Sequence, residues 1–103
     1  MDIAADELLD ELARIDATLQ LVVRRAGDGC GPELERRLQG HLRRLRTMLC
    51  ADGIAVAEDT IDAAQRVLIS ADPQAPLLVL AMARGTLEAM IRRQAANSVR
   101  DAA

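Results

Sequence analysis

The chain has 103 residues, enough for one domain with a single modest core. Half of the residues are hydrophobic, but Phe, Trp and Tyr are all absent, so the core must consist of aliphatic side chains and Ala. This composition favours helices packed on helices over a β-sandwich. The formal net charge of −3 argues against a general binder of nucleic acids or anionic membranes.

The first twelve residues and the apolar runs of the sequence bear on the cellular location of the protein. "MDIAADELLDEL" carries acids where an export signal needs basic residues. The longest apolar run, "APLLVLAMA" at 75–83, is far shorter than the roughly 20 residues of a membrane span. We therefore expect a cytoplasmic protein that does not bind membranes.

The first predicted helix covers about residues 4–26. Its apolar residues are spaced alternately four and three apart, which is typical of a helix that packs along one seam against a neighbour. They are Leu8, Leu12, Ile15, Leu19, Val22 and Ala26. Gly27 is suited to end this helix, because glycine tolerates the left-handed backbone conformation found there.

The second predicted helix covers about residues 33–51, from a start after Pro32 to an end near Asp52 and Gly53. Its apolar arc holds Leu34, Leu38, Leu42, Leu45, Met48 and Leu49. The opposite half carries the predicted partner-binding residues, which are Arg36, Arg37, Arg43, Arg44 and Arg46. These arginines either form a solvated face or bind an anionic partner, such as an acidic protein surface or DNA phosphates.

The third predicted helix is shorter, at about 55–70, and the fourth covers about 73–99. The inward residues of the third are Ala57, Ile61, Ala64, Val67 and Leu68. In the fourth, Asp72 is the expected N-cap and Pro73 the first helical residue. The sequence thus predicts an all-α, compact, four-helix bundle-like domain over 1–103, with a long C-terminal helix.

The start of the fourth helix is apolar on all sides, since Leu78 and Met82 face away from Leu80 over residues 77–83. A helical segment of this kind is buried all round. We predict that a second copy supplies the extra contact, in a homodimer whose interface contains Leu78, Val79, Met82, Leu87 and Met90. The alternative is that the first turns of this helix run through the middle of the protein's own core.

Few residues of this chain are suited to catalysis or metal binding. It has no Lys or Tyr and one histidine, His41, which falls within the apolar arc and is expected to be a core-edge residue hydrogen-bonded to a neighbour. Cys30 and Cys50 are separated by a helix about 25 Å long, whereas a disulfide needs Cα atoms within about 7 Å. We expect free thiols and no catalytic, cofactor or metal site.

Three stretches resemble helices of two known families. "ARIDATLQLVVRR" at 13–25 is similar to the first helix of the small chorismate mutases, whose sites use arginines on long helices, but the downstream lysine of that family is impossible in a chain without Lys. "RRLQGHLRRLRTML" at 36–49 and "LAMARGTLEAMIRR" at 80–93 are similar to two helices of the small repressors that sense copper or formaldehyde.

The second resemblance implies that Arg36, Arg37, Arg43 and Arg44 contact DNA. The resemblance covers about two of the four helices. The metal sensors have a cysteine ligand where this chain has Ile54 or Ala55, and a histidine ligand where it has Ser98. The resemblance therefore assigns no family.

Taken together, these features predict a small non-enzymatic interaction protein: a regulator, adaptor or chaperone-like factor that docks a protein partner. The alternative is a helical DNA-binding repressor that uses the arginines of the second helix. The absence of aromatic side chains to stack on bases argues strongly against recognition of single strands or RNA loops.

Overall fold

The computed structural model describes residues 3–28 and 31–102, and within them the chain forms four helices and no strand. The helices are α1 (Ile3–Arg24), α2 (Pro32–Met48), α3 (Ala51–Ile69) and α4 (Gln74–Ala102). The all-α prediction is therefore confirmed. Cys30, which the sequence places in the loop after α1, lies outside the described residues.

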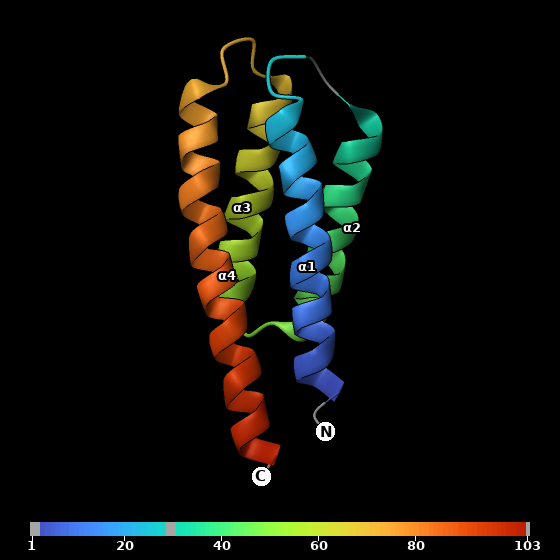
Figure 1. The fold of residues 1–103 in the computed structure, drawn as a ribbon, viewed down its shortest axis with the longest axis vertical. Coiled ribbons are helices and arrows are strands. Elements are labelled where there is room, and N and C mark those ends of the chain that lie inside the picture. The colour runs from blue at the N-terminus through green and yellow to red at the C-terminus, as the bar shows by residue number, and fades with distance from the viewer. Residues whose placement is uncertain (1–2, 29–30, 103) are drawn as a thin grey trace.

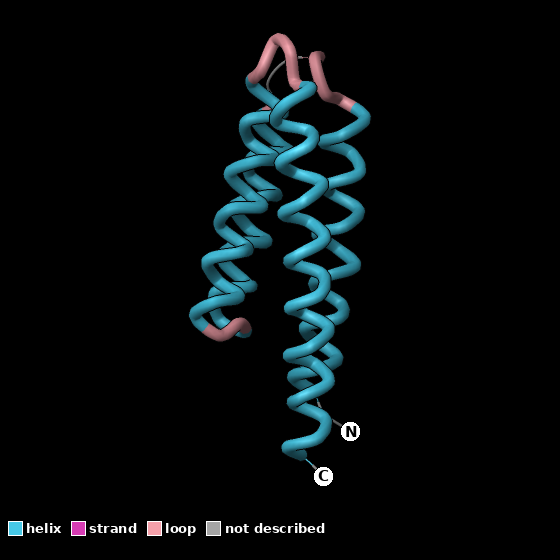
Figure 2. Tube along the Cα trace, turned by 90° about the vertical axis from the view of Figure 1, so that its left-hand side faces the viewer, coloured by secondary structure: helices cyan, strands magenta, loops and turns pink. Residues whose placement is uncertain are grey.

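The four helices lie side by side in an elongated molecule with extents of 49 × 22 × 20 Å (Figures 1 and 2). The α1–α2 and α3–α4 connections lie at one end, and α1 begins and α4 ends at the other (Figure 1). Backbone packing joins α1 to α2, α3 and α4, and joins α3 to α2 and α4. Within the described residues, α2 and α4 therefore occupy opposite corners.

The core consists of the apolar stripes that the sequence predicts. Leu8, Ile15 and Leu19 of α1 are almost completely buried, as are Leu38 and Leu45 of α2. All five predicted inward residues of α3 are buried as well. Removal of this aliphatic surface from water stabilises the fold by roughly 25 cal/mol per Å² of apolar area.

The turn between α2 and α3 differs from the prediction. The chain leaves the helical conformation at Leu49 and Cys50, and the expected connector residues Asp52 and Gly53 lie in the first turn of α3. The side chain of Gln94, on α4, stabilises this break. Its amide group donates to the Met48 carbonyl (2.6 Å) and its carbonyl accepts from the Cys50 N–H (3.1 Å). These two bonds satisfy backbone groups that the helix ends leave without a partner.

The other helix ends agree more closely with the prediction. α1 ends at Arg24, and three residues later Gly27 adopts a φ of 87° in the turn that follows. At the start of α4 the Pro73 carbonyl accepts the first helical bond, from Leu77 N–H (2.8 Å), so Pro73 and not Asp72 occupies the N-cap position.

Two helix-interior glycines make a test of this packing. A Cβ at Gly53 would lie 3.2 Å from the Leu49 Cβ, whereas a Cβ at Gly40 would meet only the Arg44 guanidinium, at 3.6 Å. Alanine in place of glycine normally stabilises a helix by about 0.5–1 kcal/mol. We expect Gly40→Ala to raise the free energy of unfolding by this amount in urea denaturation, and Gly53→Ala to show no gain or a loss. Equal stabilisation by both substitutions would contradict the observed turn.

Candidate functional site

A cluster of polar side chains is buried between α1 and α2. The carboxylate of Glu11, 1% exposed, accepts a hydrogen bond from Nδ1 of His41 (2.6 Å) and another from Nε of Arg44 (2.6 Å). The other ring nitrogen of His41, Nε2, lies 2.8 Å from the Thr18 hydroxyl, which donates to it when the ring is neutral. Two residues of α2 thus bond to one buried carboxylate of α1, and Thr18 of α1 holds the other side of the His41 ring.

His41 has the structural position that the sequence predicts. It is 5% exposed and hydrogen-bonded through both ring nitrogens. Both ring nitrogens are thus engaged by side chains of α1. Its geometry serves to hold α1 against α2.

The five arginines predicted to bind a partner are not equivalent. Arg44 binds the buried Glu11, Arg37 pairs with Glu33 on its own helix (2.9 Å), and Arg46 reaches Glu58 on α3 (3.2 Å). Arg36 and Arg43 are exposed, and neither side chain forms a hydrogen bond or ion pair with another described residue. The five therefore do not form one uniform solvated face, because acids of three helices hold three of them.

Arg36, Arg37 and Arg44 line a hollow between α1 and α2, together with Arg14 of α1. The volume of the hollow is about 600 Å³, and its remaining lining residues are Ala17, Thr18, Glu33, Gly40 and His41. Arg14 lies 3.8 Å from Glu11 through its Nη1 atom. The hollow thus concentrates four guanidinium groups on a chain whose net charge is negative.

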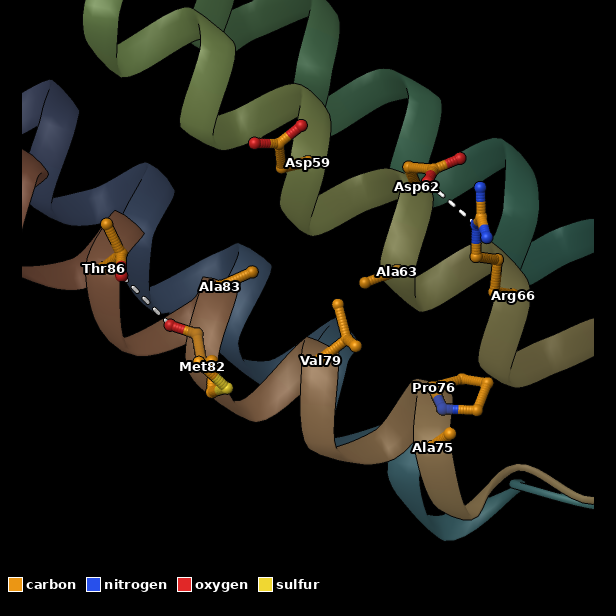
Figure 3. Close-up of a pocket in the computed structure, with 10 residues that line it drawn as sticks. All are labelled: Asp59, Asp62, Ala63, Arg66, Ala75, Pro76, Val79, Met82, Ala83 and Thr86. Atoms are coloured by element: carbon orange, nitrogen blue, oxygen red, sulfur yellow. Dashed lines mark hydrogen bonds and ion pairs between the residues drawn. The ribbon is translucent and has the colours of Figure 1, made fainter.

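A second hollow lies between α3 and α4 and has a volume of about 530 Å³ (Figure 3). Ala63 of α3 faces Val79 of α4 across it, with Asp59 and the ion pair of Asp62 with Arg66 along the α3 side. The α4 side carries Ala75, Pro76, Val79, Met82, Ala83 and Thr86. Its ten lining residues include no His, Cys, Ser or Tyr, so this groove offers a ligand mainly apolar contact.

Four of the five predicted dimer residues fall into two groups. Leu78, Val79 and Met82 are exposed by 70%, 55% and 76%, so the alternative that these turns run through the protein's own core is wrong. Leu87, by contrast, is 1% exposed and shares an inward stripe with Leu80 and Ile91. The prediction that Leu87 lies at a dimer interface is corrected, because its side chain is already covered by the core of a single chain.

Met90, the remaining predicted interface residue, is half-buried and lines a small hollow beside Cys50 and Gln94. Cys50 is exposed and free. Among residues 3–28 and 31–102, no group of three or more His, Cys, Asp or Glu side chains is arranged to hold a metal ion. None of the helices in the same ranges is both long enough and apolar enough to cross a bilayer.

The sequence interpretation missed Glu11, Thr18 and Arg14, although Glu11 and Thr18 left a signal. They are seven residues apart, two helical turns, and lie beside the apolar stripe of α1. Polar residues beside a core stripe are expected to find a buried partner, and the flank of α2 that carries His41 provides it.

No family model matches this chain, and comparisons with curated proteins and with solved structures find no match either.

The cluster around Glu11 makes a prediction about stability. His41→Leu removes one of the two short hydrogen bonds to a buried carboxylate, so we expect it to lower the free energy of unfolding by about 2–4 kcal/mol. The double variant, Glu11→Leu with His41→Leu, removes the buried carboxylate together with its hydrogen-bond donor, so no buried charge is left unpaired. The double variant is therefore expected to lose less stability than the sum of the two single variants.

The free energy of unfolding of all three variants is measured by urea denaturation, with circular dichroism as the signal. Costs that simply add in the double variant would show that Glu11 and His41 do not interact in solution.

Proposed function

We propose that this chain is a small non-enzymatic interaction protein, a regulator, adaptor or chaperone-like factor, which docks a protein partner by helix packing and acts as a homodimer. The observation that supports this most directly is the cluster of exposed aliphatic side chains at the α3–α4 junction. Ile69, Leu78, Val79 and Met82 are all more than half exposed, next to the apolar groove of Figure 3. Exposed aliphatic side chains beside an apolar groove are typical of a protein–protein contact.

The occupant that we propose for this surface is α4 of a second copy. Residues 73–83 contain no charged side chain, so two copies of this face can approach around a twofold axis without bringing like charges together. Leu78, Met82 and Gly85 follow one another at spacings of four and three residues, which is the spacing of a helix–helix seam.

Gly85 adds a second argument for this pairing. Glycine inside an exposed helix costs about 0.5–1 kcal/mol relative to alanine, and nothing lies within 4 Å of the Cβ that Gly85 lacks. The single chain therefore gains nothing from having glycine there. A second helix packed closely against this turn would explain its presence.

The arginine side of α2 is at the opposite corner from α4, so an anionic partner can bind there while two copies are paired. A DNA-binding repressor is the second candidate, and it rests on the exposed arginines of the same helix. Since Arg37, Arg44 and Arg46 each have a carboxylate partner, α2 does not present a row of unpaired charges to the repeated phosphates of a DNA duplex. We therefore place protein docking ahead of DNA binding.

The dimer predicts a specific mass change. We expect the wild type at micromolar concentration to have the mass of two chains in light scattering, and Met82→Arg to have the mass of one chain with unchanged helicity. The matched control is Val23→Arg, which places the same charge on a 44% exposed side chain of α1. A wild type with the mass of one chain would overturn the homodimer.

Gly85→Ala tests whether this turn of α4 contacts a second copy, because the substitution affects helix stability and dimerisation in opposite directions. If the turn contacts a second copy closely, the added methyl group weakens dimerisation even though alanine favours the helix. In a concentration series, we expect the Gly85→Ala dimer to dissociate at a higher protein concentration than the wild-type dimer. Stronger or unchanged pairing would remove Gly85 from the interface.

The DNA alternative predicts a different result. Each phosphate contact steepens the fall of affinity with salt by close to one unit of log–log slope, so a few arginines flanked by acids give weak binding. We expect no sequence-specific binding to duplex DNA at about 150 mM salt, near the physiological value. Tight binding that Arg36→Glu with Arg43→Glu abolishes would favour the repressor over the docking protein.

A further inference from the structure

The hollow between α1 and α2 has an excess of positive charge that the chain itself does not neutralise. Arg14, Arg36, Arg37 and Arg44 line it, and the carboxylates in contact with them are Glu33, on Arg37, and Glu11, beneath Arg44 and Arg14. Four guanidinium groups thus face two carboxylates, one of which is also bonded to His41. Arg36 forms no ion pair with any described residue.

The backbone of α2 adds space at the centre of this hollow. Gly40 is one of its lining residues, and the Cβ that it lacks would lie 3.6 Å from Nη1 of Arg44 and 3.9 Å from its Nη2. The guanidinium of Arg44 therefore lies over a bare stretch of helix. Its Nε is fixed by Glu11, while half of its side chain remains exposed to the hollow.

These features point to the charge and shape of a ligand. A single carboxylate would neutralise only part of the excess, whereas a phosphate group carries a charge of about −1.5 to −2 at pH 7 and three acceptor oxygens. Planar guanidinium groups donate to such oxygens in pairs. A phosphate group therefore matches both the charge and the donors of the hollow.

We infer that the hollow between α1 and α2 is a binding site for a dianionic phosphate group, in which Arg36 and Arg37 donate to the phosphate from one side and Arg14 and Arg44 from the other. The inference rests on the proposed function only in taking the arginine side of α2 as a binding side. The phosphate belongs either to a free phosphate compound or to a phosphorylated side chain of a protein partner, and the two sources share this chemistry.

The test is a titration of the full chain with inorganic phosphate, followed by amide and arginine Nε–H chemical shifts in NMR at constant ionic strength. We expect saturable shifts at Thr18, Gly40 and His41 that chloride alone does not produce. Arg36→Glu should weaken phosphate binding at least about tenfold, because it removes a charge-assisted donor and adds a repulsive charge. Neither Arg44 nor Glu11 is substituted, because their bond is part of the fold.

The matched control is Arg43→Glu, which makes the same charge change on the same helix but outside the hollow. We expect it to change phosphate affinity by no more than about twofold, since exposed charges at a distance are screened by salt. Equal weakening by the two variants, shifts spread over all arginines, or no saturable shift would overturn the site.

A phosphoserine peptide and its unphosphorylated form identify the source of the phosphate. Tighter binding of the phosphopeptide than of inorganic phosphate assigns the site to a partner's side chain, and equal binding assigns it to a free phosphate compound. Met82→Arg, which leaves the hollow intact, should bind phosphate as the wild type does. Failure of the phosphate site and failure of α4 pairing are therefore seen in separate measurements.

Discussion

The buried carboxylate of Glu11 is the constraint on which the pairing of α1 with α2 depends. A charge removed from water is costly unless it is paired and hydrogen-bonded, and here His41 and Arg44 supply both short bonds. Sliding α2 along α1 by one turn would separate these groups by about 5.4 Å and leave the carboxylate without its donors. The apolar stripes of the two helices tolerate several registers, whereas this cluster tolerates one.

The same cluster shapes the arginine side of the molecule. Because Nε of Arg44 is bound to Glu11, its guanidinium group is held against the lining of the hollow, with half of the side chain still exposed. Arg37 and Arg46 are drawn to Glu33 and Glu58, in opposite directions around α2. The arginines of one short segment are thus divided in space: three line the hollow beside α1, and Arg46 is bound to α3.

The apolar start of α4 has no comparable constraint within one chain. Leu80 faces the core, but Leu78 and Met82 remain in water. Such exposure is costly for a small protein, and it persists most readily when a contact outside the chain covers it. The arginine hollow and this surface lie at opposite corners, so pairing through α4 leaves the hollow accessible.

The helices and most of their buried faces were determined by the sequence alone, because residues three and four apart share a helix face whatever the rest of the chain does. This local rule placed Leu38 and Ile61 in the core and His41 at its edge. It failed where the outcome depends on residues far apart in the chain. The turn at Leu49 and Cys50 is held by Gln94 of α4, and the burial of Glu11 requires His41, thirty residues later. Leu78 and Leu87 were both predicted to lie at a dimer interface, and the packing of α4 on α1 and α3 buries Leu87 while it leaves Leu78 exposed.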